Sequence, residues 1–202
     1  MINRVALTKL QPFPIILKYT DIRSYAFTLV FILLDVAVPR LFHQFNLAGP
    51  TFLPMHILIL VAGLIFGWRA GLIVGLLTPL ASYFVSGMPV LPILPQTLVE
   101  LSSYGLVAGT LREKFKVRVI WSLLGAMAAG RLAVFLFVLV LFISAGKIYS
   151  PLGQEATPLT AVWSVIKQGW PGMLIQLVLI PVFIWLAGRL GRIAGHGKAR
   201  GR

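Results

Sequence analysis

The stretch that decides the fold class is GPTFLPMHILILVAGLIFGW, residues 49–68. It carries no acidic or basic residue, and its length is close to the roughly 20 residues with which a helix crosses a membrane. One titratable side chain, His56, lies near its start, directly after Pro50 and Pro54. Polar groups at membrane depth are costly in free energy, so this histidine raises the question of a binding site at the membrane edge.

The composition agrees with a membrane protein. Of the 202 residues, 58% are hydrophobic and 11% are charged, whereas a soluble domain is about 25% charged. We therefore expect a single membrane domain over residues 1–202. The chain has no cysteine, which excludes disulfides, thiolate catalysis and cysteine-ligated metals. We expect no cofactor and no metal.

Apolar segments long enough to cross a membrane recur along the chain. They predict an all-α polytopic membrane protein with six transmembrane helices in a compact bundle. The approximate ranges are 23–40, 51–67, 69–86, 92–112, 117–145 and 170–192. The stretch 158–168 is interpreted as a weak amphipathic piece that precedes the last helix.

The distribution of basic residues predicts the orientation. Fourteen of the eighteen Lys and Arg residues fall on one side of a six-helix arrangement, and Arg40, Lys147 and Lys167 fall on the other. The positive-inside rule then places both termini in the cytoplasm. Because the basic residues flank membrane helices, we expect them to set topology and to meet lipid headgroups, and we expect no binding to nucleic acid.

Pairs of small residues four apart predict close contacts between helices in lipid. The pairs are Gly63/Gly67, Gly71/Gly75, Gly105/Gly109 and Ala126/Gly130. They fit packing within one bundle, and they also fit docking of another membrane subunit. The sequence leaves both interpretations open.

Several polar residues fall within the expected membrane segments. Gln96, Glu100 and Tyr104 are each four apart and therefore share one helix face. Arg131 in the fifth segment could pair with Glu100, either as a structural ion pair or as part of a ligand site. Gln176 in the sixth segment adds a neutral polar group.

His56 also has two interpretations. It could cap loop carbonyls around Pro50 and Pro54, or it could contact a ligand. A metal site is not expected there, because no partner stands at ligand spacing.

Two proline-rich apolar loops are expected outside the membrane. The first, LFHQFNLAGPTFLPMH (residues 41–56), contains Asn46, and the second, SGMPVLPILPQ (residues 86–96), contains Met88. Proline restricts the backbone, so these loops could form ordered lids over a buried polar site, or they could simply lie in the headgroup region of the membrane. Such an arrangement suits capture of a small molecule from outside.

Residues 41–109 resemble the substrate-binding S components of energy-coupling factor (ECF) transporters. The resemblance is carried by LPMHI, AGLIFGWRAGLIVGLLTPL, GMP and VELSSYGLVAG. It implies a six-helix subunit in the plasma membrane of a prokaryote. Such a subunit binds a small water-soluble vitamin or vitamin precursor near the outer face, and it works with a transmembrane T component and two ATPase subunits.

The resemblance places the pocket over residues 40–56 and 86–104. The candidate ligand contacts are His56, Gln96, Glu100, Tyr104, Arg131, Gln176, Asn46 and Met88. Glu100 with Tyr104 and Gln96 favours a ligand with hydrogen-bonding nitrogens or hydroxyls, whereas Arg131 suits a carboxylate, and the sequence does not decide between them. The chain has no GxxxxGK[ST] motif, so it is not expected to hydrolyse ATP.

Two other classes of function remain open in the sequence. One is a stand-alone small-molecule carrier or channel. The other is an intramembrane enzyme that uses Glu100 and His56, although intramembrane metal chemistry needs more ligands than this chain offers at depth.

Overall fold

The computed structural model describes residues 22–44, 49–146, 148–150 and 153–199. Nearly all of them are helical. The helices are α1 (Ile22–Gln44), α2 (Gly49–Phe52), α3 (Pro54–Phe66), α4 (Trp68–Ser86), α5 (Leu94–Glu113), α6 (Val119–Ala145) and α7 (Pro158–Ala199). A short antiparallel hairpin, β1 (Ile148–Ser150) with β2 (Gly153–Glu155), separates α6 from α7.

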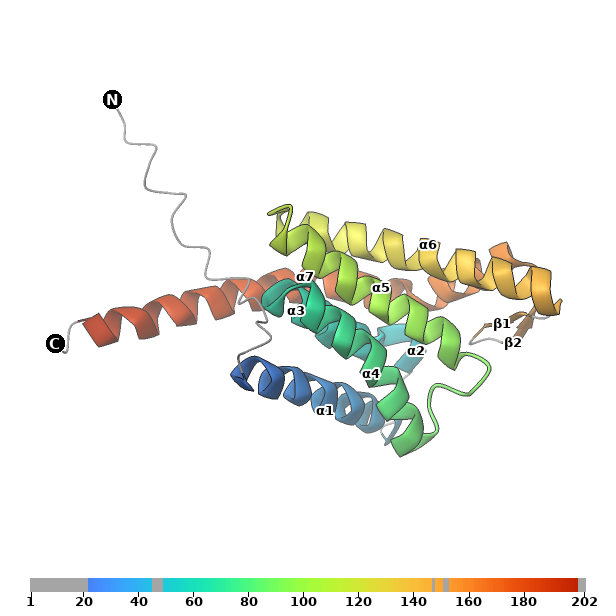
Figure 1. Cartoon of the computed structure of the whole chain (residues 1–202), viewed down its shortest axis with the longest axis horizontal. Helices are drawn as coiled ribbons and strands as arrows, with labels where there is room; N and C mark the ends of the chain where they lie inside the picture. The colour runs from blue at the N-terminus through green and yellow to red at the C-terminus, as the bar shows by residue number, and fades with distance from the viewer. Residues whose placement is uncertain (1–21, 45–48, 147, 151–152, 200–202) are drawn as a thin grey trace, which may run out of the picture.

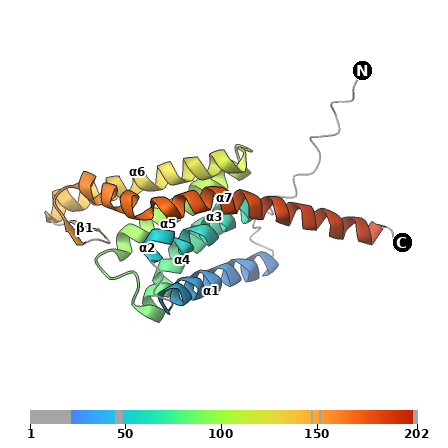
Figure 2. The same ribbon diagram turned by 180° about the vertical axis from the view of Figure 1, so that it is seen from behind.

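The six longer helices run back and forth and form one bundle (Figure 1). The hairpin marks one end of this bundle, which we call the hairpin end, together with the loop between α4 and α5. We call the opposite end, where α3 meets α4, the Trp68 end. Seen from behind (Figure 2), α7 runs along the bundle and its last turns extend beyond it at the Trp68 end.

Helix α5 occupies the middle of the bundle, where it packs against α3, α4 and α6. Its contact with α4 is made by backbone against backbone, because a Cβ atom on Gly71 would overlap the carbonyl group of Gly105. A Cβ atom on Gly63 would also lie 2.6 Å from that carbonyl oxygen. These glycines therefore serve packing within the bundle, as small residues do between membrane helices.

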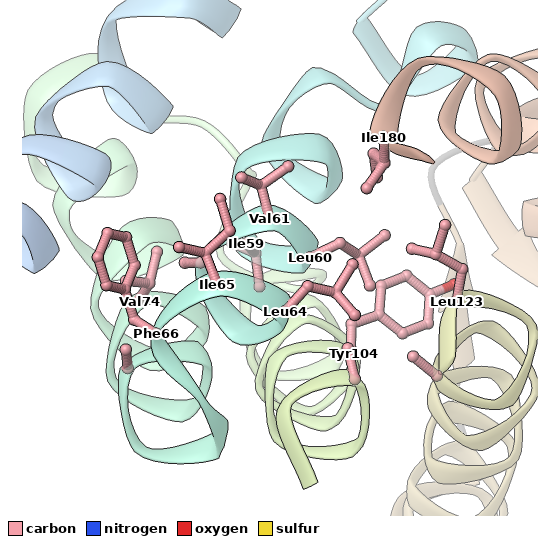
Figure 3. Close-up of a cluster of buried hydrophobic side chains, with 14 of the residues drawn as sticks. Ile59, Leu60, Val61, Leu64, Ile65, Phe66, Val74, Tyr104, Leu123 and Ile180 are labelled. Carbon is pink, nitrogen blue, oxygen red and sulfur yellow. The ribbon is translucent and has the colours of Figure 1, made fainter. Parts of the chain in front are cut away.

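The apolar core lies between α3, α4, α5 and α6, and α1 and α7 contribute Ile32 and Ile180 to it. Figure 3 shows the Tyr104 ring among Leu60, Leu64 and Leu123, all of them buried. Gly130 on α6 leaves the room for this ring, since a Cβ atom there would overlap it. The small residue of α6 thus fits a large residue of α5.

Of the helices that the structure describes, three are long and apolar enough to cross a membrane by length and composition: α4, α6 and the part of α7 up to Arg189. Helix α3 is apolar but shorter. Helix α5 carries Gln96 and Glu100, and both side chains are buried in the bundle. A central helix needs less apolar surface because its neighbours shield it from lipid.

The structure confirms the all-α six-helix fold and differs from the expected elements at three places. Residues 158–168 are the first turns of α7, a continuous helix of 42 residues, because no residue in them interrupts the helical backbone. The second segment is divided at Leu53 into α2 and α3, since Pro54 starts a new helix. The hairpin between α6 and α7 was not predicted.

Candidate functional site

A cavity of about 350 Å³ opens between the helices at the hairpin end. Such a volume lies within the range of small-molecule binding pockets. Its wall comes from α1, the α2–α3 junction, α4, the α4–α5 loop, α5 and α7. The lining residues are Pro39, Arg40, Leu53, Pro54, Met55, His56, Ser82, Ser86, Met88, Pro89, Val90, Ile93, Thr97, Glu100, Val165 and Gln168.

Glu100 is the acidic residue in this wall. Its Oε1 atom lies 2.6 Å from Nη1 of Arg131 and 3.5 Å from Nε2 of His56. All three side chains are about nine-tenths buried. His56 and Glu100 line the cavity, whereas Arg131 stands outside the lining. The arginine therefore compensates the charge of Glu100 from the protein side and leaves the cavity side for other partners.

His56 is held in place by its backbone and by its ring. Its backbone N–H group donates to the carbonyl oxygen of Leu53, with the nitrogen 3.1 Å from the oxygen. Its ring packs edge-on against the Tyr104 ring, and the ring centroids are 5.2 Å apart. The imidazole of His56 therefore lies in the first turn of α3 and forms part of the cavity wall. Tyr104 is buried in the core and orients His56 without lining the cavity.

Leu53 adopts a left-handed backbone conformation, with φ 50° and ψ 49°. This conformation costs an L-residue other than glycine about 1–2 kcal/mol. Helix α7 supports it, because Nε2 of Gln176 donates to the Leu53 carbonyl oxygen at 3.5 Å. Gly172, one turn earlier, lets α7 approach the carbonyl groups of Thr51 and Phe52. Gln176 thus stabilises the strained junction from α7 without lining the cavity.

The comparisons with known proteins agree with this arrangement. The family model described as ECF transporter, substrate-specific component, matches residues 26–184, which is most of the chain. The chain belongs to this family. No curated protein and no solved structure matches it. It is thus a multi-pass membrane protein and a transporter subunit rather than an enzyme, and its family implies a substrate and an ECF module as partners.

Of the residues predicted to contact a ligand, this S component brings His56, Glu100 and Met88 to the cavity. Gln96 is buried on the same helix face as Glu100, but it does not line the cavity. Tyr104, Arg131 and Gln176 form the layer behind the wall. Asn46 lies outside the described residues.

Other lining residues were missed by sequence reasoning. Arg40 opens the range 40–56 predicted for the pocket, but it was interpreted as a topology signal and not as a ligand contact. Val165 and Gln168 belong to the segment interpreted as a weak amphipathic piece. Ser82 and Ser86 stand four apart on α4, which is the spacing of one helix face. That spacing, just before the GMP loop, could have indicated a second polar stripe.

In the described part of the chain, no three His, Cys, Asp or Glu side chains gather as they would around a metal ion. The S component offers its cavity a carboxylate, an imidazole, hydroxyl groups and a guanidinium group. These groups recognise a ligand through hydrogen bonds and charge.

Proposed function

We propose that this S component captures a small water-soluble vitamin or vitamin precursor in the cavity at the hairpin end. The observation that carries the proposal is the cavity wall itself, in which buried His56 and Glu100 stand among mostly apolar side chains. A few fixed polar groups in an apolar pocket are typical of small-molecule sites. They fix the orientation of the ligand, while the apolar wall takes up its carbon skeleton.

Within this proposal, the candidate residues have different roles. His56, Glu100 and Met88 contact the ligand, and Asn46 in the first outer loop joins them. Arg131 and Tyr104 position Glu100 and His56. Gln176 supports the Leu53 junction. Gln96 extends the polar face of α5 toward the hairpin end without lining the cavity.

We further propose that the hairpin end faces outward and that both termini are cytoplasmic, in the plasma membrane of a prokaryote. The Trp68 end carries Arg69, and the loop between α5 and α6 brings Lys114, Lys116 and Arg118 to the same end. At the hairpin end, Arg40 and Lys167 are the described basic residues. This asymmetry is the one expected from the positive-inside rule.

The partners in this proposal are a transmembrane T component and two ATPase subunits, which supply the energy for uptake. Together with these partners, the S component would carry its ligand across the membrane and release it inside the cell. Uptake by cells that express the S component with and without a T component tests this point. Uptake that persists without the T component would indicate a stand-alone carrier.

The ligand is tested on the purified protein. We expect denaturation of the protein, extracted in mild detergent, to release a vitamin-like compound that mass spectrometry identifies. His56→Ala should lower the affinity for this compound while the protein still folds. Ser103→Ala is the matched control, because its hydroxyl group bonds the carbonyl oxygen of Val99 on α5, away from the cavity lining. If His56→Ala and Ser103→Ala bind the compound with equal affinity, the proposed role of His56 is contradicted.

A further inference from the structure

The charge of the cavity wall narrows the class of substrate. Among the described residues, two charged side chains line the cavity: Arg40 near the end of α1 and Glu100 in the middle of the bundle. Glu100 is compensated by Arg131 at 2.6 Å. The net charge of Arg40, Glu100 and Arg131 is therefore +1, and the charge left without a partner among them is that of Arg40.

No acidic side chain in the described part of the chain pairs with Arg40. Asp35 is buried beside Thr78, Glu113 accepts a hydrogen bond from the Trp68 N–H group at the opposite end, and Glu155 accepts one from Ser150 in the hairpin. Asp21, the remaining acid, lies outside the described residues.

The guanidinium group of Arg40 is anchored but still accessible. Its Nη1 atom donates to the carbonyl oxygen of Val85 at 3.4 Å, and the side chain is exposed. This contact ties the end of α1 to the end of α4, on either side of the cavity rim. A guanidinium group carries five N–H donors, so one bond to a carbonyl group leaves others for a carboxylate.

Most of the remaining lining is apolar. It includes Met55, Val90, Ile93 and Val165, and its neutral polar residues are Ser82, Ser86, Thr97 and Gln168. A charged group held against the apolar side chains would lose hydration without gaining a partner. The lining therefore offers one place for a negative charge, neutral groups for hydrogen bonds, and apolar surface for a carbon skeleton.

We infer that the substrate is a small organic monoanion whose carboxylate binds Arg40 at the rim and whose hydrogen-bonding head meets His56 and Glu100. This inference rests on the proposed function and names its substrate class. It also reassigns the carboxylate partner that the sequence suggested, because Arg131 is engaged with Glu100 outside the cavity lining. A single accessible guanidinium group matches one negative charge, which favours a carboxylate over a doubly charged phosphate monoester.

The test uses the full-length protein in detergent and a panel of water-soluble vitamins and precursors. The panel includes each acid together with its neutral amide or alcohol, such as nicotinate with nicotinamide and pantothenate with pantothenol. Calorimetry should show binding of an acid and weaker binding of its neutral counterpart. Arg40→Gln should lower the affinity for the acid about 10-fold, and Arg40→Lys should keep part of it.

Lys167→Gln is the matched control, since Lys167 is an exposed cation of the hairpin end that does not line the cavity. The affinity of this variant for the acid should stay within about twofold of the wild type, because Lys167 does not line the cavity and screening weakens the interaction of an exposed charge. An equal loss in Lys167→Gln and Arg40→Gln would overturn the assignment of Arg40.

The outcomes separate the two proposals. Tight binding of a neutral or cationic compound, unchanged in Arg40→Gln, would overturn the monoanion inference and leave the proposed function standing. Failure of every panel member to bind would contradict the proposed function itself.

Discussion

At the scale of single residues, the pair of Glu100 and Arg131 decides how the cavity is charged. Burying either side chain alone would leave an uncompensated charge, whereas the pair is tolerated at 2.6 Å. The sequence left two interpretations of this pair, a structural ion pair and a part of a ligand site. The two are compatible, because they concern different members of the pair. Arg131 supports the fold, and Glu100 stands in the cavity wall.

The structural part of this account predicts a stability effect. Glu100→Gln alone should lower the free energy of unfolding by about 3–5 kcal/mol, because Arg131 then stays buried without its partner. Glu100→Leu combined with Arg131→Met should restore most of that stability, since no charge remains buried. Thermal unfolding in detergent measures both effects, and a single variant as stable as the wild type would count against the buried pair.

Asp35 gives a second test at this scale. Its side chain is fully buried on α1 beside Thr78 of α4, and it forms no ion pair with a described residue. Asp35→Asn should change stability by less than about 1 kcal/mol, because an amide keeps the shape of the carboxyl group and brings no charge into the bundle. Asp35→Ala should cost about 1–3 kcal/mol, because it removes buried atoms from the contact between α1 and α4. Equal losses in the two variants, measured by thermal unfolding, would refute this role.

At the scale of helices, the contact of α4 with α5 depends on the absence of side chains. Gly71 and Gly105 face each other, and a Cβ atom on either would overlap the backbone of the other helix. In lipid, such close approach replaces the hydrophobic effect as the source of helix association. This contact fixes α5, and with it Glu100, against the rest of the bundle.

Gly105→Ala is therefore expected to destabilise the protein by about 1–3 kcal/mol, the usual cost of overpacking a close contact. Gly125→Ala is the matched control, because its Cβ atom would meet only Cδ1 of the Leu111 side chain, which can move. Thermal unfolding of the two variants in the same detergent compares them. A Gly125→Ala variant less stable than Gly105→Ala would contradict the assigned contact.

Much of this arrangement could be predicted from the sequence because apolar runs and small-residue spacing are local signals. Pro54 is a local signal for the break after Leu53. The left-handed conformation of Leu53 could not be predicted, since it is stabilised by Gln176 from a helix more than a hundred residues away. The start of α7 was missed because its first turns are polar enough to resemble a separate piece. Arg40 falls within the range 40–56 predicted for the pocket, but it was not predicted as a ligand contact. Its place at the cavity rim depends on how α1 ends beside α4.

At the scale of the whole molecule, α7 is the longest element. Its 42 residues span about 63 Å at 1.5 Å per residue, against a hydrocarbon core of about 30 Å. The part of α7 that exceeds the membrane thickness lies at its C-terminal end, where the last turns extend beyond the bundle at the Trp68 end (Figures 1 and 2). With the hairpin end outward, this extension would lie on the cytoplasmic side.

The absence of cysteine makes the orientation directly testable. Leu91, in the α4–α5 loop, and Phe115, in the α5–α6 loop, are 62% and 68% exposed. In intact cells, a membrane-impermeant maleimide should label the Leu91→Cys variant. It should label Phe115→Cys only after the membrane is permeabilised. The reverse pattern would invert the proposed topology.

The central claim is that the cavity at the hairpin end holds the transported molecule, and the most direct measurement is the amount of small molecule bound per chain. Denaturation of the wild-type protein should release about one molecule of a vitamin-like compound per chain, measured by mass spectrometry. The variant with Glu100→Leu and Arg131→Met, predicted to stay folded, should release far less. Equal amounts from both proteins, with both still folded, would show that the compound binds elsewhere and would contradict the account.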